Sequence, residues 1–232
     1  GSSGDGDMLK ANNLIACYNQ HKASCHLVTG DGGFDFALDF KHQEVVSIKL
    51  AFAQCAYAFS CQKKGGSFVL KLFDTYTQAS IDILYILSSV YEKVYFLKPH
   101  TSRQANSEKY IVCKNFKLEN TSEIVQAMYL IINAYDDKLH AYRFLNCNIP
   151  YRFICAVQEI NAILGQSQLE NITTTIHIID SCSTERLENL KRNNVLKCVN
   201  WCQKFKIPYN KLFPSHNLFI PARCLETESD DK

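Results

Sequence analysis

Strand-like and helix-like segments alternate through the first half of this chain, and this alternation limits the possible folds more than any other feature. Short runs rich in β-branched and aromatic residues are separated by stretches in which apolar residues recur at helical spacing. We expect strands at His26–Thr29, Ser67–Phe73, Lys93–Leu97 and Lys109–Lys114, and helices at Lys10–Tyr18, Phe40–Cys61 and Tyr76–Tyr91. Strands joined by helices of this length predict an α/β fold with a largely parallel sheet.

Two connections between these elements are short. Lys63–Gly66, two lysines followed by two glycines, is expected to end the long helix as a loop. Pro99–Ser107 is a polar loop with no helical pattern, and it joins the last two strands. Strands joined without a crossover helix pair antiparallel, so we expect an antiparallel strand at one edge of the sheet.

The second half of the chain has a different pattern. Helices are expected at Ser122–Ala134, Tyr151–Leu164 and Thr184–Lys204, while Asn171–Ile179 is β-rich but has no neighbouring strand. The acidic tail Glu226–Lys232 is expected to be disordered. We therefore divide the chain into a sheet domain, residues 1–117, and a mostly helical C-terminal region, residues 118–232.

Composition excludes some classes of function. The net charge is +2, so any surface for nucleic acid must be a local patch and not a property of the whole chain. The longest apolar runs, such as Leu50–Phe59, are too short and too mixed to span a bilayer, so no membrane partner is expected. The first residues, Gly1–Gly4 followed by acids, do not resemble a signal peptide.

Eleven cysteines are scattered along the chain, and none forms a Cys-x-x-Cys pair. The tightest spacing, Cys198 to Cys202, lacks a second ligand pair for zinc, so no metal site is expected. We interpret the cysteines as buried, reduced thiols.

Three polar residues are expected at one edge of the predicted sheet, where α/β folds place their active sites. Asp31 follows the first strand, Lys71 lies toward the carboxyl end of the next, and Glu108 opens the last strand. Because the last strand runs antiparallel, its beginning lies at the same edge as the ends of the other strands. The topology therefore predicts that these three side chains converge.

Each of these residues also has an ordinary explanation when it is taken alone. Lys71 could be a lysine in a salt bridge on an exposed strand face, and Asp31 could be a turn residue. Asn106 alone is a loop residue, and Lys41 and His42 alone are the solvated start of a helix.

Four segments together carry a more specific signal. They are Gly4-Asp5-Gly6-Asp7, Gly30-Asp31-Gly32-Gly33-Phe34, Ser67-Phe68-Val69-Leu70-Lys71-Leu72-Phe73-Asp74 and Lys98-Pro99-His100-Thr101-Ser102-Arg103-Gln104-Ala105-Asn106-Ser107-Glu108-Lys109-Tyr110. In content and in order they resemble the motifs of the FtsJ-like, mRNA-cap ribose 2′-O-methyltransferase family. The resemblance covers about Gly4 to Phe116 and implies part of a Rossmann-like methyltransferase sheet.

The resemblance also implies roles. The family is known for a Lys-Asp-Lys-Glu tetrad, of which Asp31, Lys71 and Glu108 would be the second, third and fourth members. It implies S-adenosyl-L-methionine as cofactor, with Asp7, Met8 and Asp31 against it. The first lysine and the glycine-rich cofactor loop are not in this chain, so we expect an upstream N-terminal segment of the same protein to supply them.

The chemistry implied is methyl transfer to a ribose 2′-hydroxyl of RNA, in the mRNA 5′ cap. It needs neither a metal nor a covalent intermediate. Lys71 can act as the base only when its amine is neutral, which requires a lowered pKa, and the carboxylates of Asp31 and Glu108 would hold the amine in position.

Substrate RNA is expected between two loops that lie at the same edge of the sheet and should face each other. Lys41, His42 and Gln43 begin the helix after the Asp31 loop, and Arg103 and Asn106 lie in the loop before the last strand. A guanidinium can contact a phosphate, and an amide can position a ribose. The alternative for Arg103 is an ordinary ion pair with a nearby acid.

A rival hypothesis is a non-catalytic RNA-binding or scaffold subunit that keeps the fold. The retention of Asp31, Lys71 and Glu108 favours the enzyme. The cysteine- and asparagine-rich second half is similar in style to proteins of large cytoplasmic DNA viruses of the asfarvirus kind. A viral origin predicts the host cytoplasm or the virion as location, and a cellular origin predicts the nucleus.

Overall fold

The computed structural model describes residues 5–34, 42–135, 141–181 and 184–209. Lys41, the start of the helix expected from Phe40, and the tail Glu226–Lys232 lie outside these residues. The chain divides into two compact units, Gly1–Thr173 and Thr174–Lys232. The sheet and the described candidate site residues all belong to the first unit, and the division predicted at residue 118 stays a prediction.

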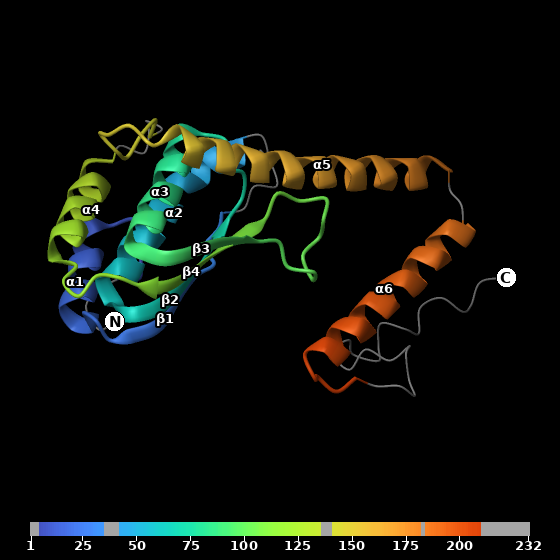
Figure 1. The fold of residues 1–232 in the computed structure, drawn as a ribbon, viewed down its shortest axis with the longest axis horizontal. Coiled ribbons are helices and arrows are strands. Elements are labelled where there is room, and N and C mark those ends of the chain that lie inside the picture. The colour runs from blue at the N-terminus through green and yellow to red at the C-terminus, as the bar shows by residue number, and fades with distance from the viewer. Residues whose placement is uncertain (1–4, 35–41, 136–140, 182–183, 210–232) are drawn as a thin grey trace. The chain divides into compact units, whose positions relative to one another are not determined.

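Four strands form one mixed sheet in the order β1-β2-β4-β3 (Figure 1). They are β1 (Cys25–Gly30), β2 (Gln62–Leu72), β3 (Tyr91–Leu97) and β4 (Lys109–Phe116). β1 and β2 are parallel, and β4 is antiparallel to both β2 and β3, so the predicted antiparallel pairing of the last two strands is confirmed. The antiparallel strand does not lie at the edge, however. β4 folds back beside β3 and also pairs with β2, which leaves β3 as the edge strand.

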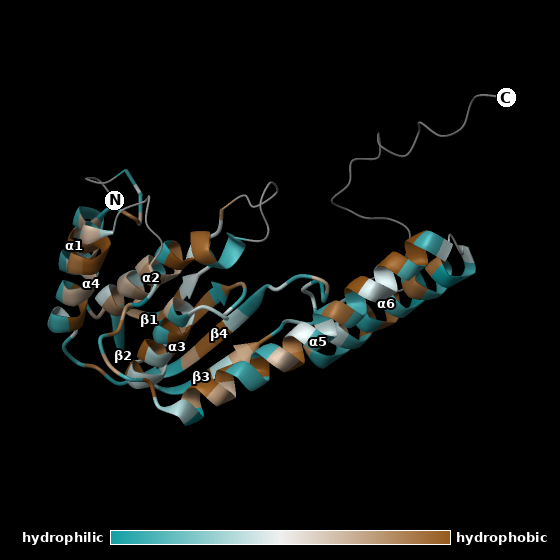
Figure 2. Ribbon diagram, turned by 90° about the horizontal axis from the view of Figure 1, so that it is seen from above, coloured by the Kyte–Doolittle hydropathy of each residue, from teal (hydrophilic) through white to brown (hydrophobic). Residues whose placement is uncertain are grey.

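The core lies between the sheet and helices α1 (Ala11–His21), α2 (Gln43–Cys61), α3 (Gln78–Val90) and α4 (Ser122–Ala134). Figure 2 shows hydrophobic residues along α2, α3 and the strands. Phe59, Phe68, Tyr91 and Phe116 are fully buried, and their ring centroids lie 5.0 to 6.5 Å apart. These aromatic contacts join α2 to β2, β3 and β4, and they fix the sheet that carries the candidate site.

The two faces of the sheet differ in burial. Side chains such as Phe68, Leu70 and Ile111 alternate onto the face that the helices cover, and each is fully buried. On the opposite face, Leu27 is 61% exposed and Leu97 is 49% exposed. In the part of the chain that is described, this second face is therefore open, whereas parallel sheets normally have both faces covered.

The start of β2 differs from the sequence prediction. The pattern at Lys63–Gly66 predicts a loop, but β2 begins at Gln62, directly after α2 ends at Cys61. Gly65 has a φ of +80°, a conformation that favours glycine, so the strand accommodates an irregular turn of the backbone there.

Two long helices follow, α5 (Tyr151–Ser181) and α6 (Thr184–Lys204). The interpretation of Asn171–Ile179 as β-rich is wrong, because these residues belong to α5. An isolated strand would leave its backbone groups without partners, whereas a helix satisfies them within the segment. None of the described helices combines the length and the apolar character needed to cross a bilayer.

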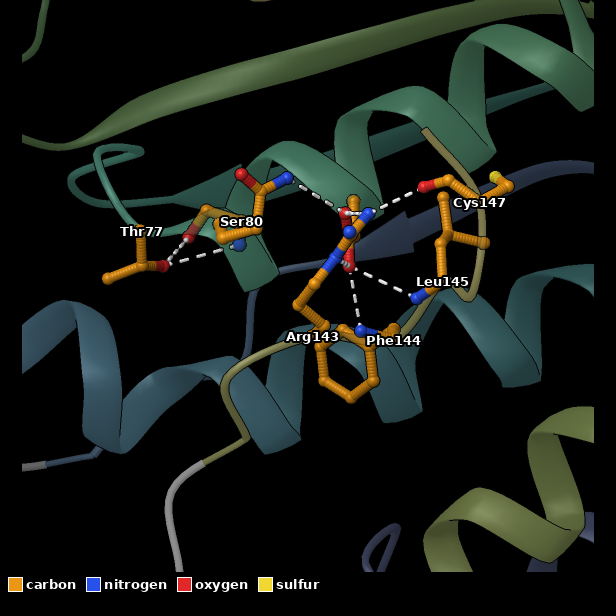
Figure 3. A network of polar contacts seen from close by, with 8 residues as sticks. Thr77, Ser80, Arg143, Phe144, Leu145 and Cys147 are labelled. Atoms are coloured by element: carbon orange, nitrogen blue, oxygen red, sulfur yellow. Dashed lines mark hydrogen bonds and ion pairs between the residues drawn. The ribbon is translucent and has the colours of Figure 1, made fainter. Parts of the chain in front are cut away.

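A buried carboxylate ties the segment before α5 to α3. Asp82 of α3 is fully buried and accepts backbone N–H bonds from Phe144 at 2.8 Å and Leu145 at 3.0 Å. Arg143 forms an ion pair with the same carboxylate at 3.3 Å and also donates to the carbonyl of Cys147 (Figure 3). Burial alone would raise the pKa of Asp82, but these hydrogen bonds outweigh it and the pKa is lowered.

The cysteines do not match the prediction of uniformly buried thiols. Among the described cysteines, Cys55 and Cys113 are buried, while Cys147 and Cys198 are exposed. Burial raises the pKa of the Cys113 thiol to about 12, so this thiol is protonated and unreactive. Cys147 lies in the segment before α5 and Cys198 lies on α6, where no side chain is buried among the described residues, so hydrophobic character alone does not decide whether a cysteine is buried.

Candidate active site

The central contact of the site joins Asp31 to Lys71. The Nζ atom of Lys71 lies 2.9 Å from Oδ1 of Asp31 and donates to the backbone carbonyl of Asp31, also at 2.9 Å. The Lys71 side chain is 15% exposed, whereas that of Asp31 is 71% exposed. The strand thus holds the amine in a largely buried position, and the loop after β1 presents a carboxylate to solvent beside it.

The loop that carries Asp31 is held by a residue that the sequence did not indicate. Oε1 of Gln54, on α2, accepts the backbone N–H of Gly32 at 2.8 Å, and Gln54 is only 4% exposed. A Cβ atom at Gly30 would lie 2.8 Å from the same oxygen, so a larger residue would displace this support. Gln54 therefore sets the position of the loop on either side of Asp31.

Glu108 lies beside this pair without an ion pair to Lys71 among the described residues. Oε1 of Glu108 accepts a hydrogen bond from Ser102 at 3.2 Å. Tyr110 stands directly across from Lys71 in the register of β2 and β4. Burial raises the pKa of Tyr110, and the negative charges of Glu108 and Asp31 raise it further. Tyr110 thus lies near both predicted carboxylates, and sequence reasoning did not assign it a role.

Lys98 organises the loop that leads into β4. Its Nζ atom donates to the carbonyl of Asn106 at 2.8 Å, to the Asn106 side-chain oxygen, and to the carbonyl of Glu108 at 2.7 Å. Burial lowers the pKa of Lys98, and the charge of Glu108 partly offsets this. Because Lys98 holds the oxygen of the Asn106 amide, the NH₂ group of that amide has no partner within the described residues.

The two loops predicted to contact RNA do meet. Ser107, in the loop before β4, donates to the side-chain oxygen of Gln43 at the start of α2, at 3.5 Å. His42 is the N-cap residue of α2. Arg103 is exposed and forms no ion pair with an acid in the described part of the chain. Lys41 lies outside the described residues.

The proposed cofactor residues Asp7 and Met8 lie in the turn before α1. A carboxylate oxygen of Asp7 accepts the backbone N–H of Leu9 at 2.9 Å, and Asp5 forms an ion pair with Lys10. The turn is therefore fixed by its own hydrogen bonds. Within the described residues, no hydrogen bond or ion pair joins it to Asp31, Lys71 or Glu108.

A known protein family matches the part of the chain that carries the candidate site. Residues 3–116, which contain the sheet, the Asp31–Lys71 pair and the loop before β4, match the FtsJ-like methyltransferase family. These residues belong to that family.

The relatives have more specific names. Cap-specific mRNA (nucleoside-2′-O-)-methyltransferase 2 of Mus musculus is 32% identical over 186 residues, which are 78% of this chain and 24% of the relative. The enzyme of the same name from Pongo abelii is 30% identical over 214 residues, 90% of this chain and 27% of the relative. Cap-specific mRNA (nucleoside-2′-O-)-methyltransferase 1 of Mus musculus is 39% identical over 123 residues, 51% of this chain and 15% of the relative.

The chain spans about a quarter or less of the length of these relatives. An alignment that covers 90% of the chain necessarily includes most of residues 118–232, so the helical region is shared with the Pongo abelii protein. The similarity therefore extends beyond the residues that match the FtsJ-like family.

Sequence reasoning assigned no role to Lys98, Tyr110 or Gln54, and the family motifs contain the first two of these residues. Lys98 and Tyr110 stand at the two ends of the Lys-Pro to Glu-x-Tyr segment, so the resemblance itself marked them. Gln54 had a weaker signal, as a polar residue in the middle of the apolar run Leu50–Phe59. A buried polar side chain needs a partner, and Gly32 is that partner.

Proposed function

We propose that this chain carries part of a site that transfers a methyl group to a ribose 2′-hydroxyl of RNA in the mRNA 5′ cap. This part positions the hydroxyl that accepts the methyl group. The observation that supports it most is the Asp31–Lys71 ion pair at the carboxyl edge of the parallel strands, with Glu108 beside it. The match to the FtsJ-like family over these residues, and the names of the relatives, supply the reaction and the substrate class.

The residues of the chain have to position a hydroxyl and remove its proton. The hydroxyl oxygen forms a bond to the methyl carbon, the bond from that carbon to its donor breaks, and the electron pair stays with the donor. Lys71, once neutral, accepts the hydroxyl proton, while Asp31 holds the amine through its carboxylate and its carbonyl. Holding the reactants in line can lower such a barrier by about 7–11 kcal/mol in favourable cases.

S-adenosyl-L-methionine, the proposed cofactor, supplies a methyl group that is already activated. The chain fits part of such a site, since Asp31 has an exposed carboxylate beside the Lys71 amine. Asp7 and Met8 are the residues proposed for the adenosine part, and Asp7 has one carboxylate oxygen with no partner among the described residues. The glycine-rich loop is assigned to the upstream segment.

The open face of the sheet supports a role for that upstream segment. Leu27 and Leu97 expose apolar surface on this face, and β1 has no neighbour on its outer edge among the described strands. We propose that the upstream segment covers the face and adds a strand beside β1. Hydrogen exchange at Leu27 should then slow when the segment is present, and unchanged exchange would contradict this arrangement.

The substrate assay that tests the function uses the full-length protein that contains this chain. Methyl transfer from labelled cofactor is measured on capped RNA and on uncapped RNA of the same sequence. We expect label on the capped RNA at a ribose position that resists alkaline cleavage. Binding of capped RNA without any transfer would contradict the enzyme and support the non-catalytic scaffold. Transfer to both RNAs at the same rate would contradict the cap as substrate.

A further inference from the structure

Helix α5, which lies beyond the residues that match the methyltransferase family, is fixed against the end of the Lys71 strand. The side chain of Asn161 accepts a hydrogen bond from the Thr75 hydroxyl at 2.7 Å and donates to the Thr75 carbonyl at 2.8 Å. Asn161 is 5% exposed and Thr75 is fully buried. This reciprocal pair fixes the backbone that carries the next residue, Tyr76.

The same helix also reaches the loop that is proposed to bind RNA. Gln168 donates its side-chain N–H to the carbonyl of Ala105 at 3.3 Å. Ala105 lies between Arg103 and Asn106, the two loop residues assigned to substrate. Helix α5 therefore stands beside the proposed RNA site, although nothing in the family motifs indicated a role for it.

Tyr76 separates two hollows along this helix, and both are also lined by Asn161 and Gly165. The hollow on the side of Asn106 and Lys109 has a volume of about 20 Å³, which is room for about one water molecule. The groove on the side of Ile81 and Leu169 has a volume of about 430 Å³, within the range of ligand sites. Only the second can take a ligand larger than water.

The Tyr76 side chain has the properties of a stacking platform. It is 61% exposed, while its hydroxyl lies near α5, 3.4 Å from the position that a Cβ of Gly165 would occupy. Burial raises the pKa of Tyr76, and the carboxylates of Asp74 and Glu44 raise it further. The hydroxyl therefore keeps its proton and can donate a hydrogen bond. Aromatic side chains with nearby amides are the usual means by which proteins bind unpaired RNA bases.

We propose that the groove between Tyr76 and α5 binds the base of an unpaired nucleotide next to the methyl acceptor, stacked on Tyr76. The proposal rests on the proposed function, because its occupant is the same RNA. The smaller hollow on the other side of Tyr76 is lined by Asn106, one of the residues assigned to substrate, and Gln158 and Gln166 add amides along the wall of the groove. These groups suit the polar edge of a base better than an aliphatic ligand.

The test compares Tyr76→Ala with Tyr76→Phe in the full-length protein that contains this chain. The probe is a capped single-stranded oligoribonucleotide of eight nucleotides. Loss of one stacked base should weaken its binding about five- to hundredfold in Tyr76→Ala. Tyr76→Phe should bind it like the wild type, because the ring is kept.

Two more variants control for folding and for surface effects. Gly165→Leu should place a side chain in the groove beside the Tyr76 hydroxyl and reduce RNA binding as much as Tyr76→Ala, with thermal stability maintained because leucine favours a helix. Tyr151→Ala removes another exposed tyrosine of the same helix, outside the groove, and should leave RNA binding unchanged.

The outcomes separate the two proposals. If the wild type transfers no methyl group to any RNA, the proposed function fails. If the wild type is active but Tyr76→Ala and Gly165→Leu bind the oligonucleotide normally, the groove is not an RNA site. Equal losses in Tyr76→Phe and Tyr76→Ala would overturn stacking, and a loss in Tyr151→Ala would show that the effect is not specific to the groove.

Discussion

Replacing Asp82 by alanine should loosen the segment that leads into α5. The change removes the acceptor of two backbone N–H groups, those of Phe144 and Leu145. Each buried donor left without a partner costs about 1–3 kcal/mol. Arg143 is one-third exposed and can regain water, so its loss adds little. We therefore expect Asp82→Ala to lower the free energy of unfolding by about 2–6 kcal/mol.

The matched variant is Asp82→Asn, which keeps the shape and one acceptor oxygen. It should lose about 1–2 kcal/mol. Phe144 and Leu145 donate to the same oxygen, which the amide can supply. The amide NH₂, however, replaces the oxygen that accepts from Gln78 and Arg143. Urea denaturation of the full chain measures both changes. A loss below about 0.5 kcal/mol in Asp82→Ala, the range of ordinary surface changes, would refute the network as an anchor.

The same carboxylate makes a prediction about pH. The pKa of Asp82 is lowered in the folded protein, so the folded state binds its proton more weakly than the unfolded state. Its contribution to stability is therefore complete above about pH 5 and is lost as the pH falls below about 4. In Asp82→Asn this part of the acid sensitivity should disappear, and an unchanged pH profile of the unfolding midpoint would contradict the assignment.

Three further changes address the candidate site. Gln54→Ala should lower stability by about 1–2 kcal/mol in urea denaturation, because the Gly32 N–H loses its acceptor, and a change below about 0.3 kcal/mol would show that the loop does not depend on it. Arg103→Ala should weaken RNA binding and reduce the slope of log affinity against log salt by about 0.7, because one phosphate is no longer neutralised; equal affinity at two salt concentrations would mean that the groove is placed wrongly. Asp7→Ala should weaken binding of S-adenosyl-L-methionine in a titration of the full-length protein, and unchanged affinity would refute its assignment.

The elements that could be predicted from sequence are those whose pattern is strong and local. The helices Ser122–Ala134 and Thr184–Lys204 have the predicted bounds in the structure. The pattern of Asn171–Ile179 misleads because its β-branched residues favour a strand only where a neighbouring strand exists. The order of the sheet is harder to predict, since nothing local to the loop after β3 says that β4 also pairs with β2.

The candidate site also has a part that the sequence predicts and a part that depends on long-range packing. Asp31 and Lys71 could be placed together because topology alone brings the ends of parallel strands to one edge, and the structure joins them directly. The support from Gln54 spans 22 residues of sequence, and no spacing rule relates a helix glutamine to a glycine N–H so far away. The hydrogen bond of Gln168 with Ala105 spans 63 residues and depends on where α5 packs, which the sequence pattern does not specify.

The central claim is that the Lys71 amine takes part in the chemical step, and methyl transfer by Lys71→Ala and Lys71→Arg tests it most directly. Arginine can keep the ion pair with Asp31, but its guanidinium stays protonated and cannot accept a proton. The Lys71→Arg variant therefore distinguishes a role of Lys71 in holding the Asp31 loop from a role as the base. Loss of a general base costs about 10²–10⁴-fold in rate. We predict a loss of at least this size in both variants, with cofactor affinity nearly unchanged. An active Lys71→Arg variant would contradict the account.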